Sequence, residues 1–144
     1  MNDSATSVFI ERFIPAPPKM LFEAWLDVEA LRRFMCPEPG VRVTRAECDA
    51  RVGGKFLIVM NVGGQDLLHH GEYVEIERYT RIAFTWLSPF AGEGSRVTLR
   101  FEQSGEGQTK LTLRHVGLEP GEIRDNHHSG WNNILTALSA LEHA

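Results

Sequence analysis

The stretch WNNILTALSAL, residues 131–141, decides the fold that this sequence predicts. Its apolar residues recur every three or four positions, as on the face of a helix that packs against a core. They are Trp131, Ile134, Leu135, Leu138 and Leu141. We expect the helix to begin between Glu119 and Ser129. Gly130 then lies inside it, at a cost of about 1 kcal/mol relative to alanine, which is tolerable if the sheet or a ligand approaches closely there.

The middle of the chain supplies the surface on which this helix would pack. From about residue 41 to residue 115 the apolar period is 2 in place of 3.6, which is typical of strands with one buried face. The alternating segments lie at about residues 41–49, 56–62, 69–76, 82–86, 97–101 and 111–115, and turns such as Gly53-Gly54 and Gly63-Gly64 separate them. Strands joined by such short turns predict an antiparallel meander.

The beginning of the chain adds one strand and two short helices. Val8–Ile14 is a β-branched and aromatic run, and prolines of the kind that follow it are tolerated in the first turn of a helix, here over Lys19–Leu26. Asp27 is a suitable N-cap for a second short helix. The whole order predicts an α+β fold, in which a curved seven-stranded antiparallel sheet wraps round the long C-terminal helix. A sheet wider than the helix leaves a gap, so this geometry favours a pocket.

Length and composition indicate one ordinary globular domain. The 144 residues are 42% hydrophobic and 24% charged, as in typical soluble domains. We expect residues 1–7 to be an N-terminal tail and residues 8–144 to form the single domain. The net charge of −4 creates no field that attracts polyanions, so we expect no nucleic-acid partner. The least polar stretch, residues 56–64, has about half of the ~20 residues of a membrane-spanning helix, so we expect no membrane insertion.

The two cysteines and the known motif patterns exclude several chemistries. Cys36 and Cys48 are too few and too far apart for a disulfide framework or a CxxC motif. Residues 1–7 lack the regions of a signal peptide, so we expect a cytoplasmic protein with reduced thiols. The sequence contains no nucleophile elbow, phosphate loop, dinucleotide fingerprint or HExxH motif. It therefore predicts no cofactor, no metal site and no catalytic residue, and it favours binding while leaving catalysis open.

Two of the predicted strands supply polar residues to the predicted pocket. If Val74 and Ile76 face inward, His70 and Glu72 face inward as well, because side chains alternate between the two faces of a strand. His115 shares a face with other apolar residues of the last strand. We therefore expect all three polar side chains on the concave side of the sheet.

The last helix adds His127, which lies four residues before Trp131 on the apolar stripe. These polar residues could converge on one end of the cavity. Such a set could orient the polar end of a ligand, bind a metal or relay a proton. The alternative is a set of buried polar residues paired with one another or with water, and the spacing is not that of a zinc motif.

Five large apolar residues are also expected inside, either as plain core or as the lining of a pocket. Ligand pockets are mostly apolar and aromatic with a few polar groups. With the polar residues, the predicted ligand-binding set is Trp25, Met60, His70, Glu72, Trp86, Phe101, His115, His127 and Trp131.

Several short motifs together resemble one protein family. They include Ile14-Pro15-Ala16-Pro17-Pro18 followed by Ala24-Trp25, then Arg51-Val52-Gly53-Gly54, Gly71-Glu72-Tyr73-Val74-Glu75-Ile76, Phe84-Thr85-Trp86 and Gly130-Trp131. In this order they resemble the activator of heat shock protein 90 ATPase homologue-like family of the START-like, or SRPBCC, superfamily. The resemblance covers nearly the whole chain and implies a helix-grip fold.

The resemblance implies no single activity, because START-like domains include lipid and hormone binders, polyketide cyclases and co-chaperone domains. Our leading hypothesis is the binding of a small apolar or amphipathic molecule between the sheet and the C-terminal helix. A second is a cyclase-like or hydrolase-like enzyme that uses Glu72 with His115 or His127. A third is a chaperone-interaction module with an exposed apolar patch. The eukaryotic co-chaperone uses a separate N-terminal domain to bind its chaperone, so a chaperone partner is not our first expectation. A homodimer through a sheet edge or a helix is compatible with all three.

Overall fold

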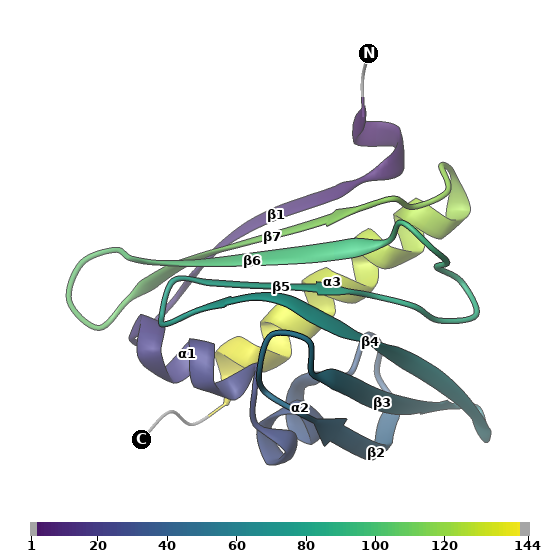
Figure 1. The fold of residues 1–144 in the computed structure, drawn as a ribbon, viewed down its shortest axis with the longest axis horizontal. Helices are drawn as coiled ribbons and strands as arrows, with labels where there is room; N and C mark the ends of the chain where they lie inside the picture. The colour runs from purple at the N-terminus through teal and green to yellow at the C-terminus, as the bar shows by residue number, and fades with distance from the viewer. Residues whose placement is uncertain (1–2, 142–144) are drawn as a thin grey trace.

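The computed structural model describes residues 3–141, and its elements follow the predicted order (Figure 1). They are η1 (Asp3–Thr6), β1 (Val8–Ile14), α1 (Pro18–Ala24), α2 (Val28–Phe34), β2 (Arg42–Cys48), β3 (Lys55–Val62), β4 (Gln65–Glu77), β5 (Arg81–Thr85), β6 (Arg96–Gln103), β7 (Thr109–Val116) and α3 (Glu122–Ala140). The first strand has the predicted bounds, and α3 begins within the predicted window. Residues 1–2 of the expected tail and residues 142–144 of the expected domain lie outside the described residues.

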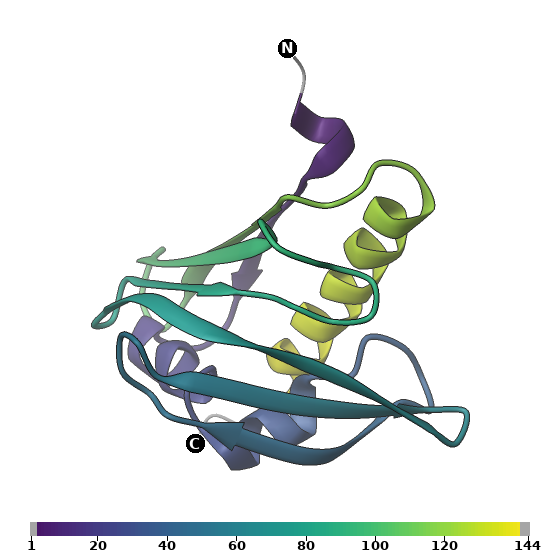
Figure 2. The same cartoon turned by 45° about the vertical axis from the view of Figure 1, so that its right-hand side comes forward.

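The strands form one antiparallel sheet in the order β1-β7-β6-β5-β4-β3-β2. Strands β2 to β7 pair in sequence order, as in a meander, and β1 extends the sheet beside β7. Figures 1 and 2 show the sheet curving round α3, which runs behind the strands in Figure 1 and comes out at their right-hand side in Figure 2. The α+β helix-grip prediction is confirmed.

Local sequence signals account for the two short helices. Pro18 occupies the first turn of α1, where its missing N–H would have no partner. The carboxylate of Asp27 accepts a hydrogen bond from the Ala30 N–H at 3.1 Å and caps α2. These helices lead the chain from the β1 edge of the sheet to the β2 edge, so that the loop after α2 reaches the side of α3.

Hydrogen bonds between the start of the chain and α3 hold this helix in place. The Arg12 guanidinium of β1 donates to Asn132 Oδ1 at 2.9 Å and to Thr136 Oγ1 at 3.1 Å. Arg124 of α3 donates to the Ser7 carbonyl at 2.8 Å. The segment that we expected to be a tail contains η1 and is tied at Ser7 to the first turn of α3.

The apolar stripe of α3 is buried against the sheet, as predicted. Its buried members are Trp131, Ile134, Leu135 and Leu138, while Leu141 is half-buried and packs against the same core. On the sheet side, Leu99, Leu111 and Leu113 are fully buried.

Strand β4 does not keep one alternation along its whole length. Its register with β5 shifts just after Tyr73, as at a β-bulge, where one extra residue inverts the faces of what lies beyond it. Ile76 packs against the core, but before the shift Tyr73 and His69 are buried. The prediction that His70 and Glu72 point inward is therefore wrong, since both side chains are exposed.

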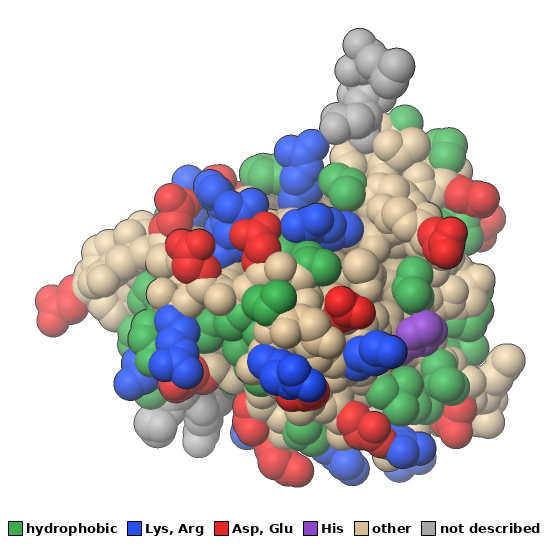
Figure 3. Space-filling view, in the orientation of Figure 1, with side chains coloured by type: hydrophobic (Ala, Val, Ile, Leu, Met, Phe, Trp, Pro, Cys, Tyr) green, Lys and Arg blue, Asp and Glu red, His purple; other side chains and the backbone are tan. Residues whose placement is uncertain are grey.

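The outer face of the sheet carries mixed charges (Figure 3). Glu75 pairs with Arg81 at 3.4 Å and with Arg96 at 3.2 Å, and Lys110 pairs with Glu11 at 3.5 Å. Acidic and basic side chains alternate here, as expected for a solvated surface. Among the described residues, no helix combines the length and the apolar character that crossing a membrane requires.

Candidate functional site

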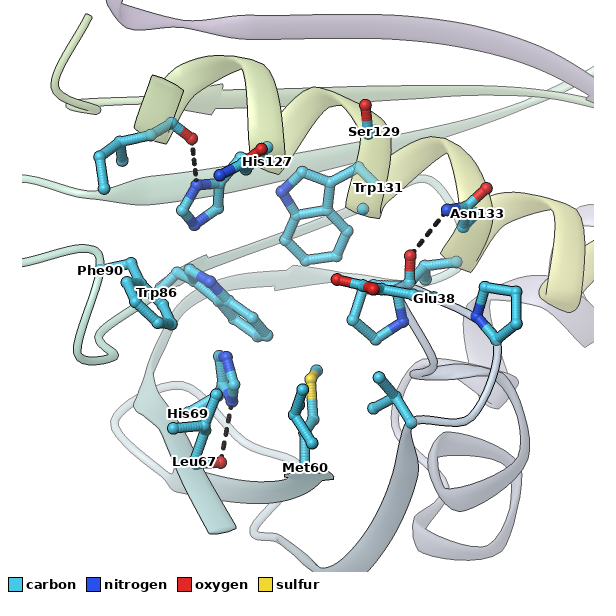
Figure 4. A pocket seen from close by; sticks show the side chains of 18 residues that line it. Glu38, Met60, Leu67, His69, Trp86, Phe90, His127, Ser129, Trp131 and Asn133 are labelled. Atoms are coloured by element: carbon cyan, nitrogen blue, oxygen red, sulfur yellow. Dashed lines mark hydrogen bonds between the residues drawn. The ribbon is translucent and has the colours of Figure 1, made fainter. Parts of the chain in front are cut away.

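A cleft of about 570 Å³ lies between α3 and the β3–β4 hairpin (Figure 4). Its other two sides are the loop after α2 and the loop after β5. The apolar lining consists of Pro37, Pro39, Val41, Met60, Val62, Leu67, Trp86, Phe90, Ile123, Trp131 and Ile134. The polar lining consists of Glu38, His69, Asn126, His127, Ser129 and Asn133.

Gly130 sets the distance between α3 and the loop after α2. A Cβ atom at this position would lie 3.2 Å from the Pro37 Cβ, which is tighter than ordinary van der Waals contact. The Asn133 side-chain amide donates to the Pro37 carbonyl at 2.7 Å and holds the loop against the helix. The loop after α2 therefore approaches Gly130 closely, and Gly130 also lines the cleft.

Trp131 is fixed by a buried hydrogen-bonded chain behind the cleft. Its indole N–H donates to His115 Nδ1 at 2.9 Å, and because an indole N–H can only donate, Nδ1 carries no proton. His115 Nε2 lies 2.6 Å from Ser95 Oγ, to which it donates its single proton. Burial lowers the pKa of His115 to about 3, and His127 contributes in the same direction. At neutral pH this imidazole is uncharged and positions Trp131.

An aromatic cluster forms the floor of the cleft. The rings of Trp86 and Trp131 lie 5.0 Å apart between centroids, and the His69 ring lies 5.1 Å from that of Trp86. Both tryptophans are almost completely buried. No protein atom among the described residues accepts a hydrogen bond from the buried indole N–H of Trp86. The floor is therefore a large apolar surface with one unused donor.

His69 adds a neutral imidazole to this floor. Its Nδ1 donates to the Leu67 carbonyl at 3.2 Å. Burial lowers its pKa to about 4, although the carbonyls of Leu67 and Ile58 act in the opposite direction. Near neutral pH, this ring contributes polarity to the cleft but no charge.

His127 lies at the end of the cleft nearest the start of α3. Its Nδ1 lies 2.8 Å from the Ile123 carbonyl, and because a carbonyl only accepts, Nδ1 carries a proton. The ring packs on His115, with centroids 5.2 Å apart. Figure 4 shows the second ring nitrogen, Nε2, turned away from the helix and into the cleft. In the neutral imidazole this atom is an acceptor.

The structure brings together only part of the predicted ligand-binding set. Met60, Trp86, His127 and Trp131 line the cleft. The other five have different surroundings: His115 lies behind Trp131, Trp25 packs on Phe34, Phe101 packs on Phe22, and His70 and Glu72 face outward.

The predicted convergence of four polar residues is therefore reduced to the contact between His115 and His127. Glu72 is on the other side of the sheet, and His115 is neutral with both ring nitrogens engaged. This arrangement does not assemble the acid–base set that we considered. Within residues 3–141 no group of three or more His, Cys, Asp and Glu could hold a metal ion.

Sequence analysis did not select most of the lining residues, among them Glu38, Leu67, His69 and Phe90. A signal for His69 was available, because the two-residue turn at Gly63-Gly64 fixes the hairpin register. Counting outward from that turn pairs His69 with Ile58, a residue whose inward position the alternation predicts. Glu38 and Phe90 lie on loops, for which periodicity gives no orientation.

Known proteins share this architecture, and one family model matches most of the chain. The family model described as activator of Hsp90 ATPase homolog 1-like protein matches residues 15–142. A solved protein from Chromobacterium violaceum is 28% identical, with a TM-score of 0.84 over 96% of this chain and 98% of that one. An HSP90 activator from Plasmodium falciparum is 31% identical, with a TM-score of 0.72 over 91% of each chain. The AHSA1-like protein from Aeromonas hydrophila is 22% identical, with a TM-score of 0.79 over 92% of this chain and 89% of that one. Among curated proteins, none matches the sequence.

Proposed function

The chain belongs to the activator of Hsp90 ATPase homolog 1-like family, and on that basis we propose that it binds a small apolar or amphipathic molecule in the cleft beside α3. The observation that carries this proposal is the cleft itself, whose volume of about 570 Å³ falls among those of small-molecule sites. The buried rings of Trp86 and Trp131 leave this space open. The predominance of apolar lining favours a hydrophobic ligand.

The charges of the lining residues restrict which ligands the cleft could bind. Glu38 is the one carboxylate among the lining residues, and none of them is lysine or arginine. Glu38 is also exposed, at the loop after α2. A ligand carboxylate or phosphate would thus lose its hydration without gaining a cationic partner. We therefore propose a ligand that is uncharged where it enters the cleft.

Two adjacent residues of β4 offer a matched test. Leu67 lines the cleft, whereas the next residue, Leu68, is 50% exposed and does not line it. The substitution Leu67→Trp should fill the space, and Leu68→Trp should leave it open. Neither leucine is a core residue, so we expect both variants to fold.

The probe is N-phenyl-1-naphthylamine, an uncharged dye whose fluorescence increases in apolar surroundings. We expect saturable binding to the unsubstituted protein and to Leu68→Trp. Leu67→Trp should bind at least about tenfold more weakly, as expected when the burial of one large apolar group is lost. Equal binding by the two variants, or no saturable binding to the unsubstituted protein, would show that the cleft is not the binding site.

A chaperone-directed function is the second candidate, and one comparison favours it. The solved relative that is 31% identical is described as an HSP90 activator. On this chain, Phe9 and Phe13 of β1 are 58% and 52% exposed, and β1 is an edge of the sheet. If these rings contact a chaperone, the protein should raise the ATPase rate of HSP90, and the double substitution Phe9→Ser and Phe13→Ser should abolish the effect. An unchanged ATPase rate with the unsubstituted protein would dismiss this candidate.

Two further expectations remain proposals. We infer a cytoplasmic location, which is supported by the free thiols of Cys36 and Cys48 because reduced cysteines are typical of reducing compartments. We also infer that residues 8–144 fold as one domain. A homodimer would form through a helix or through an edge of the sheet, where the edge strands are β1 and β2.

A further inference from the structure

The end of the cleft near the start of α3 contains one unused hydrogen-bond donor and one unused acceptor. The donor is the indole N–H of Trp86, a residue with 3% of its surface exposed, and no described protein atom accepts its hydrogen bond. In the neutral imidazole the acceptor is His127 Nε2, because the single ring proton is on Nδ1 and is donated to the Ile123 carbonyl. Figure 4 shows the two nitrogens turned toward each other at this end, and no hydrogen bond joins these two described side chains.

Of the three buried indoles in the described part of the chain, Trp86 alone has an unpartnered N–H and also lines the large cleft. Trp131 donates its N–H to His115. Trp25 also lacks a protein acceptor, but it lines only a small cavity of about 10 Å³, which it shares with Trp86 and which is no larger than the space of a single water. Only the Trp86 donor therefore combines a missing partner with a cleft that has room for an organic ligand.

The pairing of this donor with this acceptor favours a ligand group that both accepts and donates a hydrogen bond. An indole N–H requires an acceptor, and a neutral imidazole Nε2 requires a donor. A ligand carbonyl or ether oxygen could satisfy Trp86 but not His127, and an amine without a free lone pair could satisfy only His127. A hydroxyl group does both, since its oxygen accepts one hydrogen bond while its proton is donated to another atom.

We propose that the ligand carries a hydroxyl group that lies between Trp86 Nε1 and His127 Nε2, and that the cleft therefore selects uncharged phenols or alcohols with a flat apolar body. This inference rests on the proposed function, because it assigns a subsite within the same cleft. The flat body would lie against the rings of Trp86 and Trp131, and Phe90, which is half exposed at the mouth, would cover its outer side.

Three probes of nearly the same shape separate hydroxyl recognition from general apolar binding. They are 2-naphthol, which donates and accepts, 2-methoxynaphthalene, which only accepts, and naphthalene, which does neither. Affinities are measured by following the assigned indole N–H resonances during titration at pH 7.5. We expect 2-naphthol to bind at least about fivefold more tightly than 2-methoxynaphthalene, as one additional hydrogen bond to a buried group would give.

Two substitutions assign the preference to its partners. His127→Phe keeps an aromatic ring but removes the acceptor, so 2-naphthol should bind no more tightly than 2-methoxynaphthalene. Trp86→Phe removes the donor, so both oxygen-containing probes should lose affinity relative to naphthalene. Phe90→Leu is the control, which should weaken all three probes by a similar factor. The indole N–H spectrum of each variant verifies that it is folded.

The outcomes separate this inference from the proposed function. Equal affinity of the unsubstituted protein for the three probes, or a hydroxyl preference that survives in both His127→Phe and Trp86→Phe, overturns the hydroxyl subsite. So does a failure of all three probes to bind. Cleft binding is decided independently by N-phenyl-1-naphthylamine and the two leucine variants, so it can stand when the subsite fails.

Discussion

Replacing His115 with glutamine should make the stability of the protein markedly less sensitive to acid. In the folded chain His115 is fully buried, and its Nδ1 accepts a hydrogen bond from Trp131 while its Nε2 donates to Ser95. Protonation would place a charge in the core and would break the bond from Trp131. Burial accordingly lowers the pKa of this imidazole to about 3.

The sign and size of the effect follow from proton linkage. In the unfolded chain the pKa of a histidine is about 6.5, so acid favours the unfolded state, which binds the proton more readily. The contribution of His115 to stability is complete above about pH 6.5 and is lost progressively as the pH falls toward 3. Between pH 7 and pH 5 the loss from this one residue amounts to about 2 kcal/mol.

Urea denaturation at the two pH values measures this difference. His115→Gln should be less stable at pH 7, by about 1–3 kcal/mol for disturbed buried hydrogen bonds, but its loss on going to pH 5 should be smaller than that of the unsubstituted protein by about 2 kcal/mol. His70→Gln is the matched control, since His70 is exposed on the same sheet, and it should behave as the unsubstituted protein does. If His115→Gln has the same acid sensitivity as His70→Gln, the buried neutral imidazole is refuted.

Three further predictions concern packing and helix capping, and urea denaturation of the substituted proteins tests each of them. Trp131→Ala should lower stability by about 3–5 kcal/mol, because this ring is 2% exposed, and a loss below about 1 kcal/mol would mean that α3 faces another way. Gly71→Ala should lower it by at least about 1–3 kcal/mol, because the new Cβ would lie 1.9 Å from a backbone oxygen of β5. Gly92→Ala, with open space around it, should stay within about 0.5 kcal/mol, and equal losses would contradict this explanation. Asp27→Ala should cost about 1 kcal/mol of helix capping, whereas Asp27→Asn keeps an accepting oxygen and should retain most of it.

Sequence periodicity predicts the fold of this chain well because its strands and its last helix each bury one face. The alternation along β3 correctly places Met60 on the concave side, and the spacing along α3 correctly places Trp131 against the sheet. The Asp27 cap is likewise a local signal with a local cause. Such features depend on residues close together in the chain, so the sequence alone suffices.

The polar part of the cleft depends on details that periodicity does not contain. A single register shift in β4 after Tyr73 reverses the face of every residue counted back from Ile76, and this is why His70 and Glu72 were expected inside. The turn at Gly63-Gly64 would have given the right register, because no irregularity lies between it and His69. The position of Phe90 depends on the path of a loop, which only the folded structure shows.

The central claim, that the cleft beside α3 is a ligand site, is tested most directly by methyl and indole NMR during a titration with N-phenyl-1-naphthylamine. Met60 and Trp131 line the cleft, whereas Met20 on α1 does not. We predict that the Met60 methyl and the Trp131 indole N–H resonances shift with one common dissociation constant while the Met20 methyl stays in place. Binding of the dye that leaves Met60 and Trp131 unmoved, and shifts residues around Phe9 and Phe13 instead, would contradict the claim.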